Sequence, residues 1–361
     1  MEKNIFYNQP KGDIYILAGD IGGTNTNIAL IGYLNSKDRD GKQFIILAET
    51  VTPTQEIKEF IKPLRESLAW FKEIFPSVNI ASVCISGAGP IDGNYCKLTN
   101  ADWDIDGDLI SKTINIKTLV INDFLALSYG IPHLDVNAPD SIVQFASLDG
   151  SYLKPAGTTK AVIGAGTGLG VGFMPFINGS YSALPSEGGH FDFPAFSKET
   201  KDLVDWFTLQ FGFHPGMERF VSGEGLAYCY AFMVSKYNPP QDQVIKTILS
   251  APSSKRPPLI SKNASTHSFC KKVHQLYRQI YGKMAGNYAA VFLPTSGLYI
   301  AGGVISKDLP LFLSDHTFME AFSINHKENI SNLLKKIPVY VVKNYSTSLL
   351  GTAAAAVALS R

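Results

Sequence analysis

The chain has 361 residues, which is long for one domain and comfortable for two. Hydrophobic residues make up 45% and charged residues 17%, a balance that supplies a sizeable core and argues against global disorder. A formal net charge of +1 gives no bulk attraction to nucleic acid or to a membrane surface.

Targeting and redox signals are weak. The first residues are polar and no apolar run reaches the length of a membrane span, so we expect a cytoplasmic protein. The four cysteines are scattered and lack CxxC spacing, which favours reduced thiols over a zinc site or a disulfide framework.

The first third of the chain is predicted to be rich in strands. One helix is expected over Glu56–Phe75, where apolar residues follow helical spacing. The expected strands are Ile14–Asp20, Thr26–Tyr33, Phe44–Val51, Ser82–Ser86 and Asn115–Ile121.

A second block repeats the opening order of strand, Gly/Thr turn and strand. Its strands are expected at Thr159–Ile163 and Val171–Phe176, with the glycine-rich turn 164–170 between them. This similarity fits an internal duplication, and two unrelated hairpins remain the alternative.

The last part is more helical, and strands alternating with helices indicate an α/β architecture. Helices are expected at Gly225–Tyr237, His267–Phe292 and Thr347–Leu359, strands at Gly297–Ile305 and Val339–Val342, and loops at Pro239–Pro240 and Ser253–Pro258. The Lys255–Arg256 pair is expected on a solvated loop.

The first glycine turn follows an aspartate, Asp20. A plain hairpin is one interpretation of Gly22-Gly23 between apolar runs. A phosphate loop is the other, since glycines let backbone N–H groups approach an anion closely. An aspartate beside phosphate then implies a bridging cation, and Mg²⁺ is the ion that bridges carboxylate and phosphate.

The second glycine cluster matches neither common nucleotide motif. Leu169 and Val171 stand where G-x-G-x-x-G requires glycine, and no Gly-Lys-Ser/Thr follows the turn. A nucleotide would therefore be held by hairpin loops rather than by a loop that opens a helix.

Asn122-Asp123 follows a predicted strand and precedes a predicted helix start. An ordinary helix cap is one interpretation, because Asn and Asp are preferred there. The other is a functional carboxylate at the carboxyl end of a strand, where open α/β sheets bind ligands.

The pair Glu187 and His190 is a candidate for binding a polyol. Glu187 and His190 flank two glycines, which permit a tight turn with both side chains directed into one space. A structural turn histidine is the alternative for His190. Glu218 alone indicates no function, and a surface Glu-Arg pair with Arg219 is its usual explanation.

Six motifs occur in one order along the chain. They are DIGGTN at Asp20–Asn25, NDF at Asn122–Phe124, GTGLG at Gly166–Gly170, SEGGH at Ser186–His190, ERFVSG at Glu218–Gly223 and AGGV at Ala301–Val304. Together they resemble the ATP-dependent glucokinases of bacterial type, within the sugar kinase–actin–chaperone ATPase superfold. The related repressor–kinase family carries a cysteine-rich zinc motif after the equivalent of His190, and this chain has no cysteine there.

The resemblance implies a two-domain actin-like ATPase (ribonuclease H-like) fold with a central cleft. The small α/β domain would comprise 1–133 plus 345–361, and the large one 134–344. The segments Asn35–Lys42 and Ala251–Ser265 look like loops added to the compact bacterial members.

The resemblance also implies a role for each motif. Asp123 would be the general base, with Asn122, Glu187, His190 and Glu218 binding D-glucose and Asp20 holding Mg²⁺. The ATP ligands would be Gly22, Gly23, Thr24, Asn25, Gly166, Thr167, Gly168, Gly302 and Gly303. A homodimer is the assembly that the family suggests. The alternatives are a kinase for another hexose and a non-enzymatic actin- or chaperone-like ATPase.

Overall fold

The computed structural model describes residues 1–36, 43–136, 138–184, 186–343 and 346–359. The chain divides into two compact units. The first comprises Met1–Asp135, Phe176–Leu184 and Asn344–Arg361, and the second comprises Val136–Pro175 and Pro185–Lys343. The domain limits taken from the sequence placed 176–184 in the larger domain, and those limits stay a prediction.

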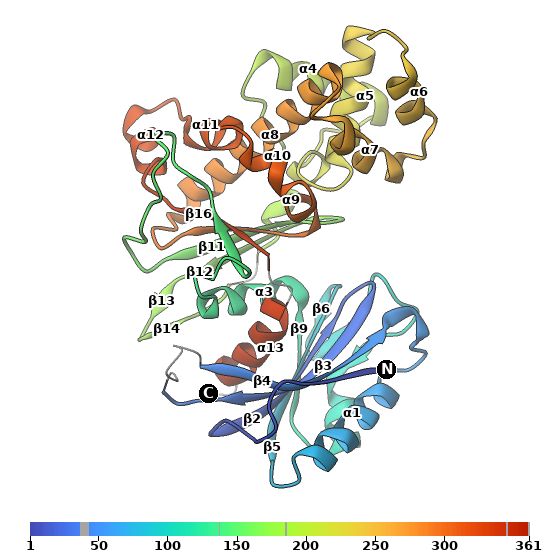
Figure 1. Ribbon diagram of the computed structural model, residues 1–361, viewed down its shortest axis with the longest axis vertical. Coiled ribbons are helices and arrows are strands. Elements are labelled where there is room, and N and C mark those ends of the chain that lie inside the picture. Colours follow the sequence, from blue (N-terminus) through green and yellow to red (C-terminus); the bar gives the residue numbers. More distant parts are fainter. Residues whose placement is uncertain (37–42, 137, 185, 344–345, 360–361) are drawn as a thin grey trace. The chain divides into compact units, whose positions relative to one another are not determined.

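The first unit is built on a mixed sheet, coloured blue to cyan in Figure 1. Its strands are β1 (Glu2–Ile5), β2 (Ile14–Ile21), β3 (Asn25–Tyr33), β4 (Phe44–Pro53), β5 (Ile80–Gly87) and β9 (Thr118–Asn122). Within the described residues the order is β1-β4-β3-β2-β5-β9. β2 pairs antiparallel with β3 and parallel with β5, which pairs parallel with β9, so the carboxyl ends of these three parallel strands meet at one edge.

Helices cover this sheet. They are α1 (Ile61–Ile74), α2 (Gly107–Ile114), α3 (Asp123–Gly130) and α13 (Ser346–Leu359), with 3-10 turns η1 (Thr54–Glu56) and η2 (Ile131–His133). Leu64 and Phe71 of α1 share an apolar cluster with Leu17 of β2. The alanine-rich α13, red in Figure 1, lies against β2, β5 and α3, since small side chains permit close packing.

Short strands complete the first unit. β6 (Ile91–Asp92), β7 (Tyr95–Cys96) and β8 (Ile105–Asp106) form one small sheet, and β13 (Phe176–Ile177) and β14 (Ser180–Tyr181) form a hairpin.

The second unit repeats the sheet arrangement of the first. Its strands are β10 (Ile142–Gln144), β11 (Lys160–Ala165), β12 (Leu169–Met174), β15 (Leu298–Ala301) and β16 (Val339–Val342). In the described part of the chain their order is β10-β16-β15-β11-β12. β11 pairs antiparallel with β12 and parallel with β15, as β2 does with β3 and β5. Each unit thus presents a glycine turn beside the end of a parallel strand.

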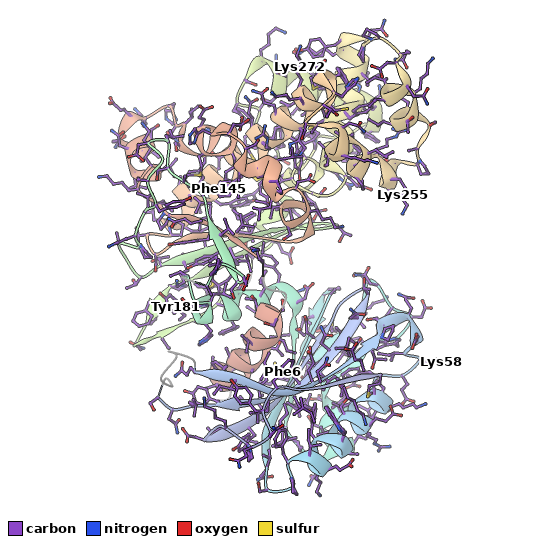
Figure 2. All side chains as sticks on the ribbon, viewed as in Figure 1. Phe6, Lys58, Phe145, Tyr181, Lys255 and Lys272 are labelled. Carbon is purple, nitrogen blue, oxygen red and sulfur yellow. The ribbon has the colours of Figure 1, made fainter. Side chains whose placement is uncertain are left out.

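Helices make up most of the second unit. They are α4 (Lys198–Phe211), α5 (Gly225–Tyr237), α6 (Gln243–Ser250), α7 (Arg256–Asn263), α8 (Ser268–Phe292), α9 (Gly303–Lys307), α10 (Leu309–Leu313), α11 (Thr317–Ser323) and α12 (Glu328–Leu334), with η3 (Gly188–His190), η4 (Met217–Arg219) and η5 (Ser253–Lys255). The long α8 is buried along much of its length and packs against α5 and α11. Phe145, labelled in Figure 2, stacks on Phe318 of α11 with ring centroids 4.7 Å apart.

The expectation of loops near residues 251–265 was wrong. This segment contains η5 and α7, and Pro257 and Pro258 occupy the first turn of α7. Proline is tolerated there because first-turn N–H groups have no intrahelical partner. Lys255 is exposed (Figure 2), whereas the Arg256 guanidinium donates to the carbonyls of Leu249 and Ala251. The other expected insertion, Asn35–Lys42, lies largely outside the described residues, since 37–42 are not described.

Other element limits also moved. The helix expected from Glu56 begins at Ile61, which places Pro63 in its first turn. The strand expected over Gly297–Ile305 ends at Ala301, because Gly302 has φ +100° and α9 follows. The remaining expected strands and the helices at 225–237 and 268–292 are present within a few residues. Among the described helices, none combines the length and apolar character that a membrane span requires.

Candidate active site

The first unit gathers polar side chains at the carboxyl edge of β2, β5 and β9. Asp20 pairs in register with Ser86, and Gly87 pairs with Asn122. The Ser86 hydroxyl donates to Asp20 Oδ1 at 2.7 Å. Three strand ends therefore present a carboxylate, a hydroxyl and the Asn122-Asp123 pair along one line.

Asp20 is a half-buried carboxylate in a negatively charged setting. Burial raises its pKa to about 6, the hydrogen bond from Ser86 offsets part of this rise, and the charge of Asp123 adds to it. Asp20 forms no ion pair with a described residue. A carboxylate that is partly withdrawn from water and has no cationic partner is unfavourable as a charge, so this position favours a cation or a proton.

Asn122 is the N-cap of α3, as one interpretation of the sequence predicted, and Asp123 is not the cap. Asn122 Oδ1 accepts from Phe124 N at 2.9 Å and from Leu125 N at 3.4 Å, and its amide donates to the Gly89 carbonyl at 3.2 Å. Asp123 is the first residue of α3, and its Oδ1 also accepts from Phe124 N, at 2.8 Å. Burial raises the pKa of Asp123, and hydrogen bonds, first that from Phe124 N, oppose the rise.

The first glycine turn joins β2 to β3, and hydrogen bonds hold it at Gly22. Gly22 N donates to Asn25 O at 3.0 Å, and Thr54 Oγ1 donates to Gly22 O at 2.7 Å. Gly23, Thr24 and Asn25 are exposed. Within the described residues, the N–H groups of Gly23 and Thr24 donate to no protein oxygen. Such free amides beside glycine suit a phosphate.

The second glycine turn joins β11 to β12. Gly166 N donates to Gly168 O at 2.9 Å, and Gly223 N donates to Gly166 O at 2.8 Å. Thr167 at its tip is exposed. This turn resembles the first in length and in its position at a strand end.

Glu187 and His190 lie together on the η3 turn, as their spacing predicted. His190 Nε2 is 3.5 Å from Glu187 Oε2. The His190 side chain is 66% exposed and the Glu187 side chain is 92% exposed, while the two glycines between them are buried. Both polar groups are therefore available to a ligand. The described part of the chain contains no group of three or more His, Cys, Asp or Glu side chains that could hold a metal.

Glu218 is not part of a surface pair with Arg219. Its Oε2 accepts from Leu169 N at 2.9 Å, immediately after the second glycine turn. The carboxylate that pairs with Arg219 is that of Glu224, with 4.0 Å between the guanidinium nitrogen and Glu224 Oε2. A Cβ on Gly168 would lie 2.6 Å from Glu218 Oε2, so this glycine admits the carboxylate. Sequence spacing could not reveal this contact, because the two residues are far apart in the chain.

Gly302 and Gly303 follow the end of β15. A Cβ on Gly302 would lie 2.2 Å from the Ala165 carbonyl oxygen, whereas a Cβ on Gly303 would meet nothing within 4 Å. Gly302 is thus required for close packing on β11, and Gly303 faces open space.

A cavity of about 880 Å³ adjoins the second glycine turn. Gly166, Thr167 and Gly303 lie in its lining. The other lining residues were not predicted from the sequence to bind a ligand. They include Ser222–Glu224, Leu226, Ser253, Ser254, Ser265 and residues of α7, α9 and α10. Pro257-Pro258 was the available signal for α7, since prolines mark helix starts.

Solved structures place this fold among the sugar kinases with the two-domain actin-like ATPase fold. A glucokinase from an Antarctic psychrotroph matches with a TM-score of 0.77 and 26% identity, covering 94% of this chain and 98% of that chain.

The family follows from sequence comparison. The family model described as Glucokinase matches residues 17–359. Glucokinases from Synechocystis sp. and Nostoc sp. are 32% and 33% identical, covering 95% of this chain and 98% and 99% of theirs. The chain belongs to the glucokinase family and is an ATP-dependent hexose kinase, which confirms the resemblance and removes the non-enzymatic alternative.

Proposed function

We propose that the protein transfers the γ-phosphoryl group of ATP to the 6-hydroxyl of D-glucose, giving glucose 6-phosphate and ADP. The observation that carries the proposal is the bond between Glu218 Oε2 and Leu169 N. It joins a carboxylate suited to sugar hydroxyls to the glycine turn suited to phosphate. A kinase needs these two functions in fixed relation, because phosphoryl transfer depends chiefly on positioning and charge stabilisation.

In this proposal Glu187, His190 and Glu218 bind the hexose. Carboxylates accept from sugar hydroxyls, and imidazole donates or accepts according to its tautomer. The exposure of Glu187 and His190 supports the assignment. The 3.5 Å contact between His190 Nε2 and Glu187 Oε2 leaves both side chains accessible to a ligand.

Asp123 is proposed as the general base that accepts the proton of the attacking hydroxyl. Burial raises its pKa, and a more basic carboxylate removes such a proton more readily. Asn122 supports the base by capping α3, and its amide is the further candidate for a sugar contact.

The adenosine moiety of ATP is assigned to the cavity of about 880 Å³ in the second unit. This volume suits a nucleoside, since ligand pockets commonly span a few hundred to a thousand cubic ångströms. Gly166, Thr167 and Gly168 would donate to phosphate oxygens there, and Gly22, Gly23, Thr24 and Asn25 form the corresponding turn of the first unit.

Mg²⁺ is proposed at Asp20. The residues fit a hard cation, because Asp20 is half-buried, unpaired among described residues and near the negative charge of Asp123. Mg²⁺ is commonly held by one or two carboxylates, with water and phosphate completing its shell. When bound, it neutralises charge on the β- and γ-phosphates.

The test is ADP formation with a panel of hexoses against a control without sugar. Glucose should give the highest kcat/KM, and the control should give little ADP. Faster turnover of mannose, fructose or an amino sugar would replace glucose as the substrate. We also propose a cytoplasmic homodimer on the strength of the family resemblance, which light scattering on the purified protein and cell fractionation would test.

A further inference from the structure

One buried tyrosine contacts both turns that carry the proposed hexose ligands. Tyr288 of α8 is 2% exposed. Its hydroxyl donates to the Gly188 carbonyl at 2.5 Å and lies 3.0 Å from Met217 Sδ. Gly188 lies between Glu187 and His190, and Met217 directly precedes Glu218. A single hydroxyl therefore reaches both η3 and η4.

The two turns are also joined by their backbones. Met217 N donates to Phe191 O at 2.7 Å, and Phe193 N donates to Pro215 O at 2.9 Å. These bonds fix the segments that leave η3 and enter η4. The Tyr288 hydroxyl reaches within η3 itself, at the glycine between the two ligand side chains.

The hydroxyl is a dependable donor. Burial raises the pKa of Tyr288, so the group stays protonated throughout the pH range in which a kinase is assayed. Its ring stacks on Phe292, with an interplanar angle of 6°, and this packing does not depend on the oxygen. Loss of the oxygen alone would remove the shorter of the two hydrogen bonds to the buried Gly188 carbonyl and leave the one from Phe191 N at 3.3 Å, so the turn would be held less firmly.

We propose that Tyr288 is a positioning residue for the hexose, holding η3 and η4 so that Glu187, His190 and Glu218 face the same sugar. The inference rests on the proposed assignment of these three residues to the hexose. Tyr288 does not line the nucleotide cavity, so its effect should fall on sugar affinity and not on ATP affinity.

The experiment compares Tyr288→Phe with the parent enzyme. We expect the glucose KM to rise about tenfold, the scale of one lost buried hydrogen bond, while the ATP KM changes less than twofold. Calorimetric titration with glucose at low temperature gives the same comparison if the variant has a reduced Tm.

The matched control is Tyr230→Phe. Tyr230 is a fully buried tyrosine of α5 whose hydroxyl has no hydrogen-bond partner among the described residues. Its loss should leave both KM values unchanged.

A glucose KM within twofold of the parent would overturn the inference, as would a parallel rise in the two KM values, which would indicate general loosening. A parent enzyme that phosphorylates no hexose would instead overturn the proposed function, together with the inference that rests on it.

Discussion

Replacing Asp123 with asparagine separates a catalytic carboxylate from a helix cap. The cap of α3 is made by Asn122 Oδ1, which the substitution does not touch. The bond from Phe124 N to Asp123 Oδ1, 2.8 Å long, can be accepted equally by an asparagine side chain. Because Asn and Asp also have similar preferences at helix starts, and because removing a carboxylate whose pKa is raised by burial acts in the stabilising direction, the free energy of unfolding should not fall by more than about 0.5 kcal/mol.

The catalytic consequence should be much larger. An amide cannot accept the proton of the attacking hydroxyl, and loss of a general base lowers kcat by roughly 10²–10⁴. This fall corresponds to about 3–5 kcal/mol of transition-state stabilisation. Turnover is followed by a coupled dehydrogenase assay for glucose 6-phosphate, and glucose affinity by calorimetry on the same preparation.

Asn122→Ala provides the control with the opposite profile. It removes the cap and keeps the base, so it should lower stability by about 1 kcal/mol and raise the glucose KM if its amide contacts the sugar, while kcat at saturating glucose stays near that of the parent. A folded Asp123→Asn variant whose kcat stays within threefold of the parent would refute the assignment of Asp123 as base.

Three further predictions follow from single residues. Asp20→Asn should raise the KM for MgATP at least tenfold and leave calorimetric glucose binding intact; unchanged MgATP kinetics would remove Asp20 from the ion site. Gly303→Val should fold with a parent-like Tm, since a Cβ there meets nothing within 4 Å, yet raise the ATP KM, whereas Gly302→Ala should lower Tm because of the 2.2 Å approach to the Ala165 oxygen; the reverse pattern in thermal melts and kinetics would contradict the assignment of the cavity. Burial lowers the pKa of Lys160 to about 8, so between pH 8 and about 10.5 the unfolded chain binds a proton that the folded protein has released, and stability rises with pH. The difference in unfolding free energy between the parent and Lys160→Met should rise by roughly 2–3 kcal/mol over that interval, and denaturant titrations that show a flat difference would disprove the shift.

Local sequence signals predicted the elements that depend on neighbouring residues. The hairpins around Gly22 and Gly166 were expected from apolar runs broken by glycines, and both occur. Hydrophobic spacing likewise predicted α5 and most of α8. The local signals were misinterpreted at α7, where two prolines were expected in a loop although they occupy the first turn of a helix.

By itself the sequence determined the family, the α/β class and the residues that are candidates for binding ATP, the sugar and the metal. Motifs such as DIGGTN and SEGGH are contiguous in the chain, and the types of their residues indicate the chemistry that they can perform. Only the tertiary structure decided how these residues are used. It showed that Asn122 rather than Asp123 caps α3, that Glu218 binds Leu169 N, and that Tyr288 joins η3 to η4. Such contacts link residues distant in the chain, and they arise from the packing of whole strands and helices, which no local pattern of residues specifies.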